Sequence, residues 1–155
     1  MIVRQATTGD TSRLAEFDNA IRADLGRANL LRRAVESGTC LVAAEGELLL
    51  GYGVLEHSFY DNAFIPLLYV RPESRRKGVG TALMRALETR SQTPKVFTST
   101  NESNSPMLAL LGALGYAPSG VIHDLDPGDP ELVFVRVVRP DLDLQREPGS
   151  SHFLD

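Results

Sequence analysis

The sequence predicts a single mixed α/β domain, with a twisted, mostly antiparallel sheet, one parallel pair of strands and helices on both faces. Three observations support this fold class. Two apolar runs flank Glu45-Gly46-Glu47, whose residue types are typical of a tight hairpin turn. After the third strand the chain runs strand, helix, strand, an order that requires a right-handed crossover and parallel pairing. Two apolar runs near the C-terminus are separated by a turn-rich connection and add further strands.

Apolar periodicity and capping residues place the individual elements in order. Strands are expected at 2–6, 39–44, 48–57, 63–70, 95–100, 119–123 and 131–138. Helices are expected within 10–21, 28–38, 78–92 and 105–115. Asp10 is the expected N-cap of the first helix, and Gly38 and Gly115 are expected to end the second and the fourth. Pro66 has no backbone N–H, so it predicts a bulge or an edge position within the strand at 63–70.

Length and composition are typical of one soluble globular domain: 155 residues, 43% of them hydrophobic and 23% charged. We expect this domain to span residues 1–138 and the polar segment 139–155 to be loose. Lys and Arg total 16 against 20 Asp and Glu, and no window approaches the roughly 18 apolar residues of a membrane span. We therefore expect a cytoplasmic protein that binds neither nucleic acid nor membrane, with no metal.

The one cysteine, Cys40, excludes an internal disulfide. It lies in the apolar run CLVAA, whereas reactive thiols need accessible, electropositive surroundings. A buried structural thiol is therefore favoured over a nucleophile.

The basic turn Arg75-Arg76-Lys77-Gly78-Val79-Gly80 carries the strongest functional signal. Taken alone, the cations also fit a solvated surface loop. The glycines allow the backbone to approach a ligand, and the helix that follows begins with amides that have no intrahelical partner. Those amides, the positive end of the helix dipole and the cations together favour a phosphate.

Two common phosphate-binding motifs fit this turn poorly. A Walker motif requires Lys-Ser or Lys-Thr after its last glycine, and here Gly80 is followed by Thr81-Ala82. A dinucleotide fingerprint requires a third glycine where this chain has Leu83. Nucleotide binding is therefore a distant alternative.

The turn resembles the acyl-CoA pyrophosphate loop of the GCN5-related N-acetyltransferase (GNAT) superfamily, whose pattern is Gln/Arg-x-x-Gly-x-Gly/Ala. The order of elements resembles that superfamily over residues 1–138, and NSPMLALLGALGY resembles the family's fourth helix through Asn104 and Gly115-Tyr116. The resemblance implies about six to seven strands and about four helices. It also implies a cofactor-binding set, in which acetyl-CoA is the cosubstrate: Leu68, Tyr69, Val70, Arg75, Arg76, Lys77, Gly78, Val79, Gly80, Thr81 and Asn104. Asn104 equally fits a capping residue.

By this resemblance the protein transfers acetyl from acetyl-CoA to a primary amine of a small molecule or a protein, by direct attack. The sequence departs from the family pattern at Leu111, where many members have the tyrosine that protonates the leaving thiolate. The alternative is therefore a catalytically weak or inactive acyl-CoA-binding sensor or regulatory module. A homodimer is compatible with either function.

A proton must leave the attacking amine, and the turn after the third strand offers His57 as the base, with Glu56 and Tyr60 as alternatives. His57 also fits an ordinary surface residue. Tyr116 aligns with a packing position and is expected in the core. The acidic connection at 123–131 fits an attractor for a cationic acceptor or an ordinary turn, and its carboxylates are Asp124, Asp126, Asp129 and Glu131.

Overall fold

The computed structural model describes residues 1–143, which form two compact units. The first unit comprises Met1–Leu55 and Leu67–Leu87, and the second comprises Glu56–Pro66 and the chain from Glu88 onward. The expected boundaries, one domain over 1–138 and a loose segment after it, stay a prediction. Pro140–Asp143 form a short helix, α6, and residues 144–155 lie outside the described residues.

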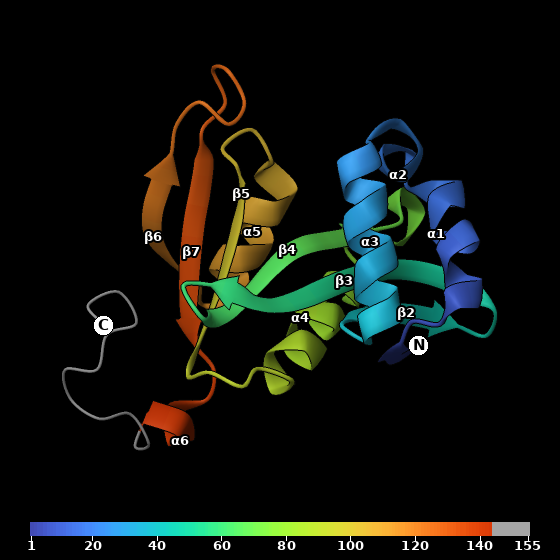
Figure 1. Cartoon of the computed structure of the whole chain (residues 1–155), viewed down its shortest axis with the longest axis horizontal. Helices are drawn as coiled ribbons and strands as arrows, with labels where there is room; N and C mark the ends of the chain where they lie inside the picture. The colour runs from blue at the N-terminus through green and yellow to red at the C-terminus, as the bar shows by residue number, and fades with distance from the viewer. Residues whose placement is uncertain (144–155) are drawn as a thin grey trace. The chain divides into compact units, whose positions relative to one another are not determined.

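The described strands form one seven-stranded sheet in the order β1-β2-β3-β4-β5-β7-β6 (Figure 1). They are β1 Ile2–Gln5, β2 Cys40–Glu45, β3 Leu48–Phe59, β4 Asn62–Val70, β5 Lys95–Asn101, β6 Ala117–Ile122 and β7 Glu131–Val137. The β4–β5 pair is parallel, whereas the β1–β2, β2–β3, β5–β7 and β6–β7 pairs are antiparallel. The mixed, mostly antiparallel sheet confirms the predicted fold class.

The helical elements are more numerous near the N-terminus than the sequence predicted. They are η1 Thr8–Asp10, α1 Thr11–Phe17, α2 Asn19–Ala23, α3 Leu25–Ser37, η2 Pro72–Ser74, α4 Val79–Thr89 and α5 Ser105–Leu114. Three α-helices replace the expected two because Asp18 and Asp24 adopt extended backbone and cap the helices that follow them. Asp10 precedes α1, as predicted, but its carboxylate binds Arg4 and the Thr7 amide rather than capping α1.

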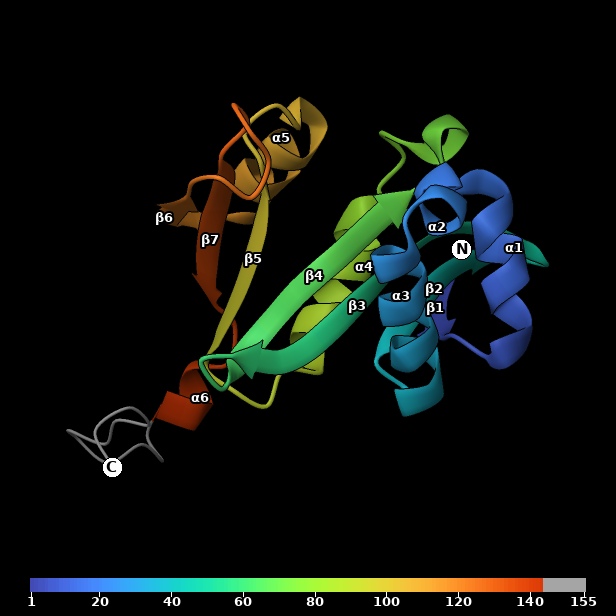
Figure 2. The same cartoon turned by 45° about the horizontal axis from the view of Figure 1, so that its top comes forward.

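The first unit places its strands between two layers of helix. Helices α1–α3 lie over one face and α4 over the other, as both views show (Figures 1 and 2). Tyr52 belongs to the core cluster beneath α1–α3, whereas a Cβ on neighbouring Gly51 would lie 3.3 Å from Leu83 of α4. Successive β3 residues therefore face opposite helical layers, as the period of a strand requires.

The predicted turns are present, whereas the edge position predicted for Pro66 is wrong, because β4 lies between β3 and β5. Gly46 turns β2 into β3 with a φ of 60°, and Tyr60 and Asp61 turn β3 into β4 with φ values of 51° and 62°. The parallel register of β4 with β5 covers Ala63 to Ile65 and ends at the residue before Pro66.

In the second unit the buried carboxylate of Glu88 has side-chain partners from the same unit. Glu88 accepts hydrogen bonds from the Tyr116 hydroxyl at 2.8 Å and from Arg136 at 3.2 Å. Tyr116 is therefore a buried core residue, as expected.

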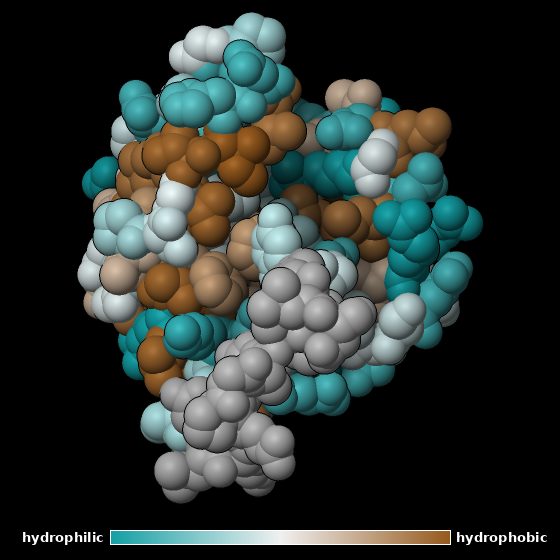
Figure 3. Space-filling view, turned by 60° about the vertical axis from the view of Figure 1, so that its left-hand side comes forward, coloured by the Kyte–Doolittle hydropathy of each residue, from teal (hydrophilic) through white to brown (hydrophobic). Residues whose placement is uncertain are grey.

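The side of the second unit that carries β6 and β7 displays apolar side chains (Figure 3). Val121, Ile122, Leu125 and Val137 are among the large hydrophobic residues exposed there. A groove of about 540 Å³ is lined by Lys95, Phe97, Gly115, Ala117, Ser119, Val135, Arg136 and Val137. None of these lining residues belongs to the predicted cofactor set.

Candidate functional site

The loop between β4 and α4 has the backbone geometry of an anion site. Arg76 and Gly78 adopt the left-handed region, with φ values of 62° and 84°. The first bond of the helix runs from the Ala82 amide to the Gly78 carbonyl at 3.0 Å, so the amides of residues 79–81 precede any intrahelical partner. These amides and the positive end of the α4 dipole fit a phosphate.

The three cations of the loop are arranged differently from one another. Arg76 and Lys77 are exposed. Arg75 bends back along β4, where its Nε donates to the Val70 carbonyl at 3.1 Å and its guanidinium lies 5.4 Å from the centre of the Tyr69 ring. Arg75 is thus held in place by β4, whereas the other two cations extend into solvent.

The end of β4 presents different side chains to the two helical layers. Leu68 reaches the side of α4, because its methyl lies 3.2 Å from the position of a Cβ on Gly53, beside Leu87. Tyr69 packs instead on the core beneath α1–α3 and stacks on Phe17 with 6.1 Å between ring centres. The predicted pantetheine-binding backbone, Leu68–Val70, therefore lies at the boundary between the two faces.

Three arginines gather on the stacked pair of Phe17 and Tyr69. Arg71 lies 4.4 Å from the centre of the Phe17 ring, and Arg27 and Arg75 each lie 5.4 Å from the centre of the Tyr69 ring. We call these five residues the arginine–aromatic cluster. Sequence reasoning missed it, because only the spacing of Tyr69, Arg71 and Arg75 is local, while Phe17 and Arg27 arrive from distant helices.

A buried network holds one side of this cluster. Asp18 is 1% exposed, and its Oδ2 accepts from the Tyr52 hydroxyl at 2.6 Å and from Arg27 Nη2 at 2.7 Å. Arg27 Nε also donates to the Tyr52 oxygen at 3.2 Å. Burial and the bond to Asp18 raise the pKa of Tyr52, so this hydroxyl remains a donor. Asp18 also neutralises the charge of Arg27.

His57 occupies a structural contact within the second unit. Its Nε2 accepts a hydrogen bond from the Gln92 amide at 3.0 Å, and burial lowers the pKa of the imidazole. A backbone N–H can only donate, so this nitrogen carries a lone pair and the ring is neutral. The role of His57 as base stays a prediction, and it requires this bond to be released.

The lowered pKa of His57 sets an expected pH dependence of stability. In the unfolded chain the histidine binds a proton near pH 6.5, whereas in the folded protein it does so only at lower pH. The contribution of neutral His57 to the free energy of unfolding is therefore present above about pH 6.5 and is lost as pH falls. We expect the free energy of unfolding to fall less between pH 7 and 5 in His57→Gln than in the wild type, because the glutamine oxygen accepts the Gln92 amide at every pH. Urea titrations at several pH values measure the free energy of unfolding of both proteins. An equal dependence on pH in the wild type and in His57→Gln would contradict the prediction.

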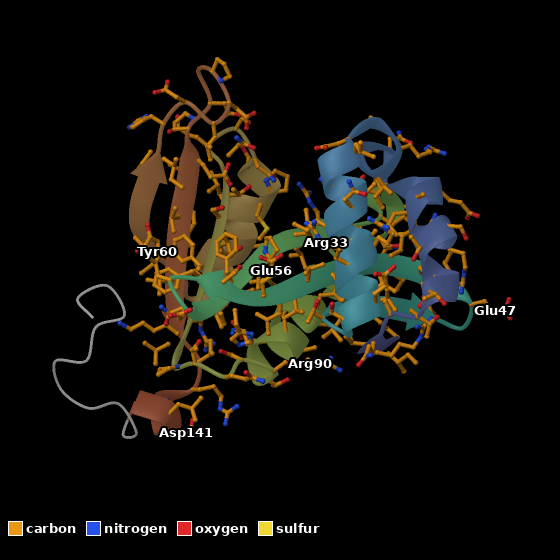
Figure 4. The ribbon with its side chains drawn as sticks, viewed as in Figure 1. Arg33, Glu47, Glu56, Tyr60, Arg90 and Asp141 are labelled. Carbon is orange, nitrogen blue, oxygen red and sulfur yellow. The ribbon has the colours of Figure 1, made fainter. Side chains whose placement is uncertain are left out.

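The remaining predicted residues have the following positions. Asn104 is the N-cap of α5 and accepts from the Met107 amide at 3.3 Å, so the capping alternative is present. Leu111 is fully buried. Glu56 lies on β3, where it accepts from the Ser58 hydroxyl at 3.0 Å, and Tyr60 lies at the β3–β4 turn (Figure 4).

Two carboxylates of the acidic connection accept hydrogen bonds from residues at and just after the end of β5. Asp126 accepts from the Asn101 side chain at 2.9 Å, and Asp129 accepts from the Ser103 amide at 3.0 Å and from the Ser103 hydroxyl. These bonds favour the turn interpretation over an attractor for cations.

Cys40 is a buried free thiol whose pKa burial raises to about 12, which favours the structural interpretation. Within residues 1–143, no three His, Cys, Asp or Glu side chains are grouped so as to hold a metal ion. No helix in that same range has the length and hydropathy needed to cross a membrane.

Comparisons with known proteins agree with this geometry. A GNAT-family acetyltransferase from Bacillus cereus ATCC 10987 is 31% identical, with a TM-score of 0.81 over 88% of this chain and 96% of the other. The structure of yncA from Salmonella typhimurium, with its cofactor acetyl-CoA, is 15% identical, with a TM-score of 0.70 over 98% of both chains. The ribosomal-protein-alanine N-acetyltransferase of Brucella melitensis is 18% identical, with a TM-score of 0.68 over 88% of this chain and 99% of the other.

A search of the curated proteins found no match. The sequence model of the acetyltransferase (GNAT) family matches residues 9–116, a span that includes the β4–α4 loop and all of α5. The chain therefore belongs to the acetyltransferase (GNAT) family.

Proposed function

We propose that the protein transfers acetyl from acetyl-CoA to a primary amine of a small molecule or a protein. The observation that carries this proposal is the start of α4, where the amides of residues 79–81 follow a left-handed glycine and three cations. Its fold relatives include a structure with acetyl-CoA bound. Among the phosphate carriers considered, acetyl-CoA is the one that both the loop and the family favour.

Each segment of the predicted set has a distinct task. Residues 75–81 hold the pyrophosphate through helix amides and cations. The backbone of Leu68–Val70 binds the pantetheine arm as it would bind an added strand. Asn104 belongs to the second unit, where it caps α5, and its contact with the cosubstrate stays a prediction.

The chemistry needs few side chains. An amide in Leu68–Val70 donates to the thioester carbonyl and stabilises the negative charge that develops on it as the amine attacks. A C–N bond forms, the C–S bond breaks, and CoA departs as a thiolate. A thiol with a pKa near 8.5 leaves without an acid, so the buried Leu111 does not prevent the reaction.

The proton of the amine requires an acceptor, and His57, Glu56, Tyr60 and water are the candidates. We propose that His57 chiefly positions the segment around Gln92, because its lone pair already accepts that amide. We therefore expect His57→Gln to retain most of its turnover with acetyl-CoA and a reactive amine. A loss of about 10²–10⁴-fold would instead identify His57 as the base.

The second candidate function is an acyl-CoA sensor, which the absence of the usual tyrosine at position 111 favours. Two measurements separate the candidates. Acetyl-CoA should raise the thermal midpoint of unfolding while ATP and NAD at equal concentration should not. Steady release of thiol with a panel of amines then identifies an enzyme, whereas binding without release identifies a sensor.

The loop cations give a direct test of the cofactor site. Replacing Arg75 and Arg76 with alanine should weaken acetyl-CoA binding by about 1–3 kcal/mol, because charge-assisted contacts to phosphate are lost. Turnover at saturating acetyl-CoA should change less. Calorimetric titration measures the affinity, and Arg32→Ala, an exposed arginine on α3, is the control. Unchanged affinity for acetyl-CoA in the double variant would show that this loop does not bind the pyrophosphate.

A further inference from the structure

The two faces of β4 in the first unit suit different ligands. The helix amides that fit the phosphates belong to α4, and Leu68 faces the α4 side. The opposite face is covered by α1–α3 and carries Tyr69 and Arg71. A cosubstrate held by α4 and by the β4 backbone leaves this second face for the acceptor, an argument that rests on the proposed function.

The arginine–aromatic cluster on that face carries uncompensated positive charge. Asp18 neutralises Arg27. Arg75 is assigned to the pyrophosphate by the proposed function, and among the described residues Arg71 forms no ion pair, although Glu73 lies two positions away. The cluster is thus a local cationic surface on a chain whose formal net charge is −4.

Arg71 is held ready for a ligand. Its Nε donates to the Leu49 carbonyl at 3.0 Å, and its guanidinium lies over the Phe17 ring, so its orientation is set before a ligand arrives. Its two terminal nitrogens donate no hydrogen bond to any described residue, and they have the spacing that a carboxylate accepts. Arg71 is half-buried, which suits a small ligand and strengthens a charged contact.

We propose that Arg71, seated on Phe17 in the arginine–aromatic cluster, binds a carboxylate carried by the amine acceptor. The acceptors are then small amines with a carboxylate, such as amino acids. Arg71 is a specificity-determining residue in this assignment, and Tyr69 and Phe17 supply the apolar wall for the rest of the acceptor. Polycationic amines are disfavoured because the cluster repels them.

Binding of product-like probes tests the proposal independently of turnover. N-acetylglutamate, N-acetylphenylalanine and N-acetylmethionine are each titrated against the full chain beside their α-carboxamides, with and without saturating CoA, in low salt. We expect at least one acid to bind about 10- to 100-fold more tightly than its carboxamide, because a charge-assisted contact is gained. Arg71→Gln should abolish this preference and leave the affinity for acetyl-CoA unchanged.

Matched variants complete the experiment. Arg71→Lys keeps the charge without the planar pair of donors and should retain part of the preference. Arg32→Gln should retain all of the preference, because this exposed arginine bonds just the Asn29 side chain among residues 1–143. The thermal midpoint of each variant shows that it is folded.

Three results would overturn the assignment. The first is equal or absent binding of the acid and the carboxamide in every pair, and the second is a preference for the acid that survives Arg71→Gln. The third is a lower affinity for acetyl-CoA in Arg71→Gln, which would assign Arg71 to the cosubstrate site. Failure of the wild type to bind acetyl-CoA is a separate result, and it would refute the proposed function.

Discussion

Asp18→Ala should lower the free energy of unfolding by about 3–5 kcal/mol, because it removes one partner of a buried ion pair. The variant leaves Arg27 without its carboxylate and the buried Tyr52 hydroxyl without its acceptor at 2.6 Å. It also removes the cap of α2, where Asp18 accepts from the Ala20 amide. Because Phe17 immediately precedes Asp18, the platform beneath Arg71 should be disturbed as well.

Urea denaturation of the wild type and the variant measures this effect. Asp24→Ala is the matched control, since Asp24 caps α3 by accepting from the Gly26 and Arg27 amides but is exposed. Loss of an exposed cap should cost only about 1 kcal/mol. Equal losses in the two variants would show that the buried network contributes little beyond helix capping.

Gly51→Ala should destabilise the protein by about 1–3 kcal/mol or more and weaken acetyl-CoA binding at the same time. A Cβ at position 51 would lie 2.6 Å from the Tyr69 carbonyl oxygen and 3.2 Å from the Val70 Cα. Backbone atoms cannot rotate away as a side chain can, so β4 must shift. The shift falls on the segment proposed to bind pantetheine.

The control for this substitution is Gly112→Ala on α5. A Cβ there would meet no atom within 4 Å beyond its chain neighbours and the nearby backbone of its own helix, and alanine is a better helix former, so stability should be unchanged or higher. Thermal unfolding and calorimetric titration with acetyl-CoA measure the two effects. If Gly51→Ala lost stability but kept its affinity for acetyl-CoA, the backbone of β4 at residues 69–70 would not be part of the cosubstrate site.

The sequence by itself determined the elements whose signals are local. The β4–α4 loop was identifiable because glycines, cations and a helix start follow one another within a few residues, and Asn104 and Gly115 marked the ends of α5 for the same reason. The resemblance to the GNAT family depended on these same local patterns.

Only the tertiary structure decided the contacts made between distant segments. His57 reads as a titratable base beside a turn, yet its partner is the amide of Gln92, 35 positions away. Asp18 lies within the first helix that the sequence predicts, but in the fold it adopts extended backbone and is buried against Arg27 and Tyr52. In the sequence Arg71 is a cation at the end of a predicted strand. The fold places it over the ring of Phe17, which belongs to α1. Residue type and spacing report the local backbone, whereas burial and charge pairing depend on which helix packs on which face of the sheet.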